Sequence, residues 1–241
     1  MSLVSLTEVL DRASRGGYAV GAFNCHNMEI VQSIARAAEK EKSPVIIQAS
    51  QGAIKYAGLE YITSLVEEAV REVSVPVVLH LDHGTSLQQV VQCIRHGFTS
   101  VMIDGSRLTL EENIKLTAGV VRIARAVGVS VEAEIGKIGG TEDDISVKES
   151  EALLTDPEEA VRFVEETGVD ALAIAIGTAH GQYRGEPELD FNRLEKINRL
   201  VPCPLVLHGS SGVPDGDLKR AVQLGIRKIN IDTNIREVFV K

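Results

Sequence analysis

Short apolar runs alternate along the chain with longer segments of amphipathic character. Eight of these runs are rich in Val and Ile and are bracketed by Gly, Pro, Asn or Asp, which predicts strands. The expected strands span residues 19–23, 45–49, 77–81, 100–103, 130–135, 171–176, 204–207 and 228–231. Apolar residues recur at helical spacing between them, and the expected helices span 28–41, 59–73, 86–97, 111–127, 157–167, 190–200 and 214–224. The N-terminal stretch MSLVSLTEVLDRASRGG predicts a further amphipathic helix.

Strands that alternate with helices and have nearly continuous apolar interiors predict a parallel sheet covered on its faces. The count of eight favours a closed (β/α)₈ TIM barrel over an open doubly wound sheet. An open sheet should carry a glycine-rich dinucleotide loop after its first strand, but here Asn24-Cys25-His26-Asn27 follows without GxGxxG. We expect one barrel domain over residues 1–241 that is incomplete at its C-terminus, because a closing helix needs roughly 11 residues and only about nine follow Asp232.

Composition narrows the classes of protein that this chain can represent. Apolar residues make up 44% and charged residues 24% of the 241 residues, which is typical of a globular enzyme. The net charge of -9 argues against a nucleic-acid partner. Three cysteines without CxxC spacing favour a reduced, cytoplasmic setting, and no apolar run predicts a secretion signal or a membrane span.

Three histidines lie just beyond the ends of expected strands. His83, His180 and His208 are each followed by glycine, and each comes after an apolar run. The carboxyl ends of barrel strands meet at one mouth, where TIM-barrel chemistry takes place. A set of three histidines that leaves a fourth position open is typical of catalytic zinc. We therefore predict a divalent metal site at this mouth.

Polar side chains end all eight expected strands, which makes a capping role for every one of them less plausible than a shared site. They are Asn24, Ser50, Asp82, His83, Asp104, Glu132, Glu134, His180, His208, Asn230, Asp232 and Thr233. Asp104 and Glu134 offer further oxygen ligands, which could orient the histidines or hold another metal. Of the other histidines, His80 and His96 are expected to fill structural roles, and His26 is ambiguous.

Two glycine-rich stretches after the last two strands predict phosphate-binding loops. One runs from Gly209 through Ser210 and Ser211, and the other from Asn230 through Ile231 and Asp232 to Thr233. Barrels of this kind usually bind phosphate on the backbone N–H groups of these two loops. An ordinary turn is the alternative for each stretch taken alone.

Two acidic positions are candidates for proton transfer. Asp82 adjoins His83, and adjacent residues near a strand end point in different directions, so the two are not expected to bind one metal. Asp82 is then a candidate acid or base beside the metal, and the alternative is a carboxylate that only orients a ligand imidazole. Residues 136–144 contain three glycines and end in Glu142-Asp143-Asp144. They predict either a mobile loop that carries an acid over the mouth or a solvated acidic loop.

The motifs HLDHG, SVMIDGS, VEAEIGKIGGTEDD, GTAHG, LVLHGSSG and KINIDT occur in this order between Leu3 and Val240. Together they resemble the class II, metal-dependent ketose-bisphosphate aldolases, which include fructose-1,6-bisphosphate and tagatose-1,6-bisphosphate aldolases. The loop GSSG departs mildly from the GGSG or GGTG of many members. The resemblance also implies roughly another 40 residues of helix beyond Lys241, judged as about three helices of ordinary length.

The resemblance implies a role for each matching position. It implies that His83, His180 and His208 bind the catalytic Zn²⁺, that Asp104 and Glu134 match a second cation position, divalent or monovalent, and that Asp82 is the proton donor. Glu142 matches a loop acid that moves the ketose proton. The implied substrate-binding residues are Asn24, Ser50, Gly181, Gly209, Ser210, Ser211, Asn230, Ile231, Asp232 and Thr233. The implied assembly is a cytoplasmic homodimer or homotetramer.

The expected activity is therefore reversible cleavage of fructose 1,6-bisphosphate to dihydroxyacetone phosphate and glyceraldehyde 3-phosphate through a zinc-stabilised enediolate. Tagatose 1,6-bisphosphate is the alternative substrate, and a non-catalytic phosphosugar-binding protein is the alternative of another class. A Schiff-base aldolase needs a lysine at a carboxyl strand end. The sequence predicts none there, since Lys228 is expected to begin the last strand. A metal-dependent hydrolase would need His-x-His on the first strand, where this chain has Phe23-Asn24-Cys25-His26.

Overall fold

The computed structural model describes residues 3–142, 145–148, 152–183 and 185–241, with the backbone alone for residues 141–142 and 145–147. Eight parallel strands close into a barrel in the order β1-β11-β10-β8-β5-β4-β3-β2. These strands are β1 (Val20–Asn24), β2 (Val45–Ser50), β3 (Val77–Gly84), β4 (Ser100–Ile103), β5 (Ser130–Ile135), β8 (Ala171–Ile174), β10 (Leu205–Leu207) and β11 (Ile226–Ile231). The TIM barrel predicted from the sequence is thus confirmed.

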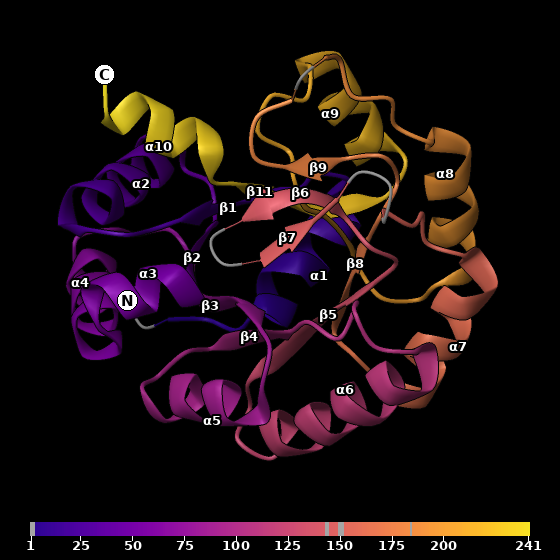
Figure 1. Cartoon of the computed structure of the whole chain (residues 1–241). Coiled ribbons are helices and arrows are strands. Elements are labelled where there is room, and N and C mark those ends of the chain that lie inside the picture. Colours follow the sequence, from indigo (N-terminus) through magenta and orange to yellow (C-terminus); the bar gives the residue numbers. More distant parts are fainter. Residues whose placement is uncertain (1–2, 143–144, 149–151, 184) are drawn as a thin grey trace.

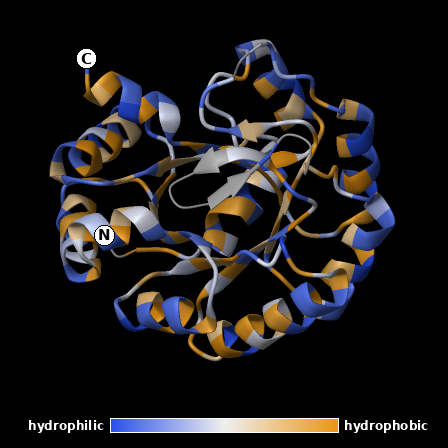
Figure 2. Cartoon of the chain, in the orientation of Figure 1, coloured by the Kyte–Doolittle hydropathy of each residue, from blue (hydrophilic) through white to orange (hydrophobic). Residues whose placement is uncertain are grey.

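Helices surround the barrel on its outside (Figure 1). They are α2 (Met28–Glu41), α3 (Gln51–Ala57), α4 (Leu59–Arg71), α5 (Leu87–Arg95), α6 (Leu110–Arg125), α7 (Pro157–Thr167), α8 (Phe191–Leu200), α9 (Asp215–Gln223) and α10 (Thr233–Phe239). Most of these helices follow an N-cap residue whose side chain accepts a hydrogen bond from a backbone N–H of the first turn, as Asn27 and Asp156 do. Thr109 forms a reciprocal capping box with Glu112. Their apolar stripes turn toward the strands and their polar stripes turn outward (Figure 2).

The helix α1 (Leu6–Gly16) closes the amino-terminal end of the barrel. Its buried residues, such as Leu6 and Leu10, pack against barrel residues that include Ile46 and Val78. The hydroxyl of Thr7 lies 2.9 Å from that of Ser130, which begins β5. Because this end is filled by apolar side chains, the opposite, carboxyl end is where a polar site can form.

A small second sheet lies at the carboxyl end, in front of the barrel in Figure 1. It consists of β6 (Gly139–Glu142), β7 (Ile145–Val147) and β9 (Ala179–His180). The strands β6 and β7 form an antiparallel hairpin, and β6 pairs in parallel with β9. The sequence predicted a loop for residues 136–144. These residues form a strand because β6 pairs with β9, which lies about 40 residues further along the chain.

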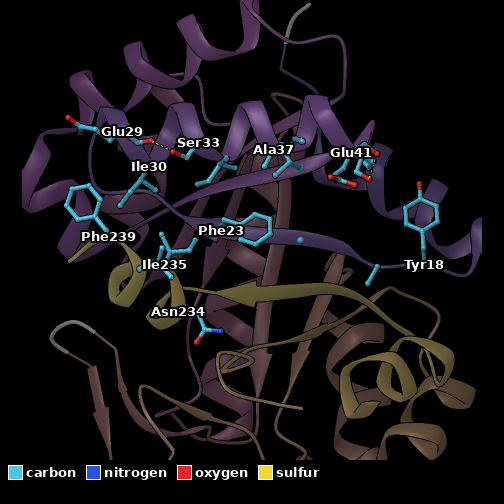
Figure 3. Close-up of a pocket in the computed structure, with 18 residues that line it drawn as sticks. Tyr18, Phe23, Glu29, Ile30, Ser33, Ala37, Glu41, Asn234, Ile235 and Phe239 are labelled. Carbon is cyan, nitrogen blue, oxygen red and sulfur yellow. Dashed lines mark hydrogen bonds between the residues drawn. The ribbon is translucent and has the colours of Figure 1, made fainter. Parts of the chain in front are cut away.

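An apolar groove of about 690 Å³ lies on the outside of the barrel, between β1, α2 and α10. Figure 3 shows Phe23 and Ile235 lining it, with Ile30 and Phe239 at one end. Phe23 and Ile235 are partly buried and pack against the main apolar core, so the groove lies in the outer layer of the molecule. Within the described residues, no helix is both long and apolar enough to cross a membrane.

Candidate metal and phosphate site

The structure brings the three predicted histidines together at the carboxyl end of the barrel. The ring centroids of His83 and His208 are 4.7 Å apart, those of His83 and His180 are 5.1 Å apart, and those of His180 and His208 are 5.9 Å apart. One nitrogen of each ring lies within 4.8 Å of the others. Three nitrogen donors in one cluster match the ligand set of a catalytic zinc site.

A carboxylate behind His83 fixes which of its nitrogens faces the cluster. His83 Nδ1 lies 2.9 Å from Asp104 Oδ2. Because a carboxylate only accepts, Nδ1 is the donor and Nε2 carries the lone pair. That Nε2 lies 3.0 Å from His208 Nδ1. Two ring nitrogens this close need a proton or a cation between them, so the residues present fit a bound divalent metal.

Glu134 gives a second group of possible ligands. One of its carboxylate oxygens lies within 4.8 Å of ligand atoms of His83 and Asp104. The side chain of Glu134 is buried, and its backbone oxygen accepts from Asn113 Nδ2 at 2.9 Å. Asp104 and Glu134 are thus close enough to share one cation with His83.

The charges around the cluster are set by burial and by ion pairing. Burial lowers the pKa of His208 to about 4, although its hydrogen bond to Glu132 acts in the opposite direction. Burial alone would raise the pKa of Glu132. The charge of the Lys228 ammonium and the hydrogen bond with His208 act more strongly in the opposite direction, so the pKa of Glu132 lies well below its usual range. Burial also opposes ionisation of Asp104, yet contacts with His83 and Ser106 lower its pKa. Neutral imidazoles backed by ionised carboxylates are the states that metal binding requires.

Asp82 is fully buried beside the histidines and is surrounded by amides. Asn24 Nδ2 donates to Asp82 Oδ2 at 2.9 Å, and Gln48 Nε2 donates to the same oxygen at 3.1 Å. Asn230 Nδ2 lies 3.3 Å from Asp82 Oδ1 and also 3.3 Å from His208 Nδ1. Asn230 therefore lies between the carboxylate and the metal cluster, and Asp82 borders the same mouth.

The backbone at His83 explains how two adjacent residues share one mouth. His83 has a left-handed φ of 48°, and the pairing of β3 with β4 is irregular between Leu81 and Gly84. Such an irregularity re-aims side chains at the end of a strand. We expected Asp82 and His83 to point in different directions, and among the described residues His83 belongs to the clustered ligand atoms whereas Asp82 does not, although both lie at the same mouth.

The predicted phosphate-binding residues other than Ile231 line one small pocket next to His180. Its lining consists of Asn24, His180, Gly181, Gly209, Ser210, Ser211, Asn230, Asp232 and Thr233. Tyr183 ties the two sides of this pocket together, because its hydroxyl accepts from Ala179 N and donates to Gly209 O, both at 2.8 Å. The grouping of loops that are far apart in sequence is what the resemblance implied.

Two predicted substrate residues lie outside the pocket lining. The hydroxyl of Ser50 accepts from Ala53 N at 3.2 Å and caps α3, a helix that the sequence did not predict. Ile231 ends β11. Glu142 lies on β6 by its backbone, but its side chain falls outside the described part of the structure, so its predicted role is not tested.

The remaining histidines occupy separate positions. His80 Nδ1 lies 2.8 Å from Ser100 Oγ inside the barrel, and His96 Nδ1 lies 2.8 Å from Gln92 O at the end of α5, as expected of structural residues. His26 is in the mouth, where its Nε2 lies 3.8 Å from Asp232 Oδ1. The sequence left His26 ambiguous, and the structure places it next to a predicted phosphate residue.

Two buried polar residues near the site, Gln48 and Lys228, were not predicted as part of it, and Glu132 was predicted only as one of the polar groups at the strand ends. Gln48 binds Asp82, and Glu132 and Lys228 form an ion pair behind His208. Lys228 lies within β11 and not at its start. The signal was present for Glu132 and Gln48, since each interrupts an apolar strand. It was weak for Lys228, because lysine at a strand start is common on surfaces.

Comparison with known proteins agrees with the fold and the motifs. A family model described as class-II fructose-bisphosphate aldolase matches residues 4–241. The chain is 49% identical over 241 residues to a sulfofructosephosphate aldolase of Alkalicoccus urumqiensis, covering 100% of this chain and 84% of the relative. It is 48% identical over 260 residues to a fructose-bisphosphate aldolase of Thermus caldophilus, covering 98% and 85%.

A solved structure supports the same assignment. The crystal structure of the YdjI aldolase from Escherichia coli K12 has a TM-score of 0.89 and 37% identity, covering 99% of this chain and 84% of that one. The fold, the polar carboxyl end and these relatives define a metal-dependent aldolase, a carbon–carbon lyase. The chain belongs to the class II fructose-bisphosphate aldolase family.

Proposed function

We propose that this protein reversibly cleaves fructose 1,6-bisphosphate to dihydroxyacetone phosphate and glyceraldehyde 3-phosphate. The observation that carries the proposal is the juxtaposition of the three imidazoles, the buried Asp82 carboxylate and the glycine-lined pocket at one end of the barrel. Relatives named for fructose bisphosphate support this substrate over tagatose 1,6-bisphosphate.

His83, His180 and His208 would hold the divalent cation, and Zn²⁺ is the metal expected for this family. When bound, the metal supplies Lewis acidity, because it polarises a carbonyl oxygen and stabilises the negative charge that develops as the C3–C4 bond breaks. The carboxylate of Asp104 orients His83 through the 2.9 Å contact. With Glu134 it also forms the place for a second cation, divalent or monovalent.

Asp82 would accept the proton of the C4 hydroxyl in cleavage and return it to the aldehyde oxygen in condensation. The amides of Asn24, Gln48 and Asn230 contact its two oxygens and hold the carboxylate in place. Amide donors do not exchange the proton that Asp82 carries, so the carboxylate is the only member of this group that can transfer one at neutral pH. Glu142, on the hairpin over the mouth, is proposed for the second proton, at the carbon that loses its bond.

The pocket beside His180 would bind the phosphate of the dihydroxyacetone phosphate half. Gly181 and Gly209 would offer backbone N–H groups, and Ser211 and Thr233 would add hydroxyl donors. The hydroxyl of Ser210 donates to Leu207 O at 3.1 Å, so Ser210 would contribute its backbone N–H. Asn24 and Asn230 reach both the pocket and Asp82, so they connect phosphate binding to the reacting carbons. Ile231 and Asp232 shape the same loop, and Ser50 would contact the glyceraldehyde 3-phosphate half.

Substrate specificity is tested by comparing kcat/KM for several sugars on one zinc-loaded preparation. Fructose 1,6-bisphosphate is expected to give the highest value, followed by tagatose 1,6-bisphosphate and a sulfofructose phosphate. A higher kcat/KM for either of the other sugars would make that sugar the preferred substrate and would leave the proposed aldol cleavage unchanged. Tight binding of all three without cleavage would overturn the aldolase proposal in favour of a phosphosugar-binding protein.

We also propose a cytoplasmic homodimer or homotetramer, as the resemblance implied. Cys25, Cys93 and Cys203 are all free, which suits a reducing compartment. Sedimentation of the purified protein tests the assembly, and a monomer at micromolar concentration would contradict it.

A further inference from the structure

A buried ion pair holds His208 from the side away from the metal cluster. His208 Nε2 lies 2.8 Å from Glu132 Oε1, and Lys228 Nζ lies 2.9 Å from Glu132 Oε2. All three side chains are fully buried. Burying an ion pair often costs more free energy than packing apolar side chains of the same size. The presence of this pair therefore points to a role beyond packing.

The ion pair decides which nitrogen of His208 carries the proton. Lys228 keeps Glu132 ionised, and an ionised carboxylate only accepts hydrogen bonds. The proton of the neutral imidazole must then be on Nε2, which leaves the lone pair on Nδ1. That Nδ1 is the atom that lies 3.0 Å from His83 Nε2, toward the proposed metal position.

The other tautomer would close the site. If the proton of His208 moved to Nδ1, this nitrogen could donate to His83 Nε2 across the same 3.0 Å, which is a normal hydrogen-bond length. His83 could only accept, because Asp104 fixes its own proton on Nδ1. The contact between the two rings is therefore either an internal hydrogen bond or a pair of ligands for one cation.

We propose that Glu132, charged and held in place by Lys228, is a positioning residue that keeps His208 in the Nε2–H tautomer and the site open to a divalent cation. Lys228 also balances the carboxylate, so the pair sets the tautomer without adding net charge. The inference rests on the proposed metal site, but it does not depend on which sugar is cleaved.

Two double variants separate the hydrogen-bond acceptor from the charge. Glu132→Leu with Lys228→Met removes both charges and leaves no acceptor for His208 Nε2. Glu132→Gln with Lys228→Met removes the same charges but keeps an amide oxygen that can accept. Apolar replacement of a whole buried ion pair is often neutral for stability, so the Leu/Met variant is expected to fold. The Gln/Met variant keeps the shape of the Glu132 side chain and a hydrogen-bond acceptor for His208, so it is expected to fold as well.

Two measurements follow the tautomer and the metal directly. Imidazole ¹⁵N NMR of the metal-free protein should show Nε2–H at His208 in the wild type and in the Gln/Met variant, and Nδ1–H in the Leu/Met variant. Zn²⁺ affinity, measured by competition with a chelator, should fall about 10–100-fold in the Leu/Met variant. The Gln/Met variant should recover most of this loss.

A purely structural role would give a different pattern. If the folded Leu/Met variant kept both the Nε2–H tautomer and wild-type Zn²⁺ affinity, the proposal would be overturned. A wild-type protein with Nδ1–H at His208 would overturn it without any variant. A wild type that binds Zn²⁺ in the expected tautomer but cleaves no ketose bisphosphate would leave this inference intact and refute only the proposed function.

Discussion

In the proposed mechanism, proton transfer depends on the carboxylate of Asp82. It is fully buried, and the three amides that contact it come from three different strands, β1, β2 and β11. Each strand end thus contributes one donor that holds the carboxylate without competing for its proton. The arrangement orients the group at little entropic cost when substrate binds, because its position is already fixed.

Replacement of Asp82 by Ala should reduce kcat by about 10²–10⁴-fold, the usual contribution of a general acid or base. Zn²⁺ content should stay near the wild-type value, because Asp82 is not among the clustered ligand atoms. Steady-state cleavage and metal analysis on the same preparation check both expectations. Ser33→Ala on α2, far from the mouth, is the control. Near-normal turnover of the metal-loaded Asp82→Ala protein would remove Asp82 from the mechanism.

Removal of the metal should abolish cleavage while the protein stays folded. A chelator is expected to lower activity by at least about 10²-fold, since the metal supplies several kcal/mol of charge stabilisation. Addition of Zn²⁺ should restore activity, and circular dichroism before and after checks that the barrel persists. Full activity in the chelated protein would refute the metal mechanism.

At the scale of single residues, the sequence predicted the cluster of three histidines, because His-Gly after an apolar run is visible without the fold. It could not predict how Asp82 and His83 share a mouth, since this depends on a φ of 48° at one residue. It also missed Gln48, whose importance comes from its contacts with Asn24 and Asp82 on other strands. Such contacts exist only after the barrel closes.

Among the elements, the small sheet over the mouth links the hairpin to His180, one of the three proposed metal ligands. Gly140 on β6 pairs with His180 on β9. Gly140 has a φ of +98°, and a Cβ atom added there would lie 2.1 Å from the carbonyl oxygen of His180. Only glycine fits this approach. The hairpin therefore helps to set the position of His180.

Gly140→Ala should weaken Zn²⁺ binding and lower kcat/KM, because the backbone at His180 must move to accept the methyl group. Gly119→Ala is the matched control, since Gly119 lies in α6 and its added Cβ meets nothing within 4 Å. The control should keep wild-type activity and gain up to about 1 kcal/mol of stability. Chelator competition, kinetics and urea unfolding measure these effects. Equal Zn²⁺ affinity in the two variants would contradict the coupling between the hairpin and His180.

The hairpin of β6 and β7 also shows which kind of element a local sequence pattern does not predict. Long amphipathic segments predicted α7 over residues 157–167 with the bounds that the structure gives. The glycine-rich segment 136–144 predicted a loop, because glycine has low strand propensity. Its strand forms through pairing with β9, a contact between distant parts of the chain that no local pattern encodes.

Over the whole molecule, the barrel has one end filled by α1 and one end lined with polar groups. Closure of the barrel places buried titratable groups such as His80, Glu132 and Lys228 in its interior. The eight barrel strands followed from the periodicity of the sequence, whereas β6, β7, β9 and the interior charges did not. These groups make the stability of the fold depend on pH.

Stability of the metal-free protein should fall as the pH drops from 7 to 5. Burial, assisted by the charge of Lys228, holds the pKa of His80 well below its usual value, and burial lowers that of His208 to about 4. The folded state therefore keeps both rings neutral, whereas the unfolded chain takes up protons below a pH of about 6.5. Since the unfolded state binds more protons, the free energy of unfolding decreases by up to about 1.4 kcal/mol per pH unit for each ring.

His80→Asn isolates one of these contributions. Asparagine can keep the hydrogen bond to Ser100 but does not titrate, so the slope of unfolding free energy between pH 6 and 5 should become shallower by about 1.2 kcal/mol per pH unit. Urea unfolding at several pH values measures the slope. Asp104 and Glu132 do not interfere in this window, because their lowered pKa values lead to proton uptake by the unfolded chain only near pH 4 and below. A wild-type slope in the variant would mean that His80 is already protonated in the folded barrel.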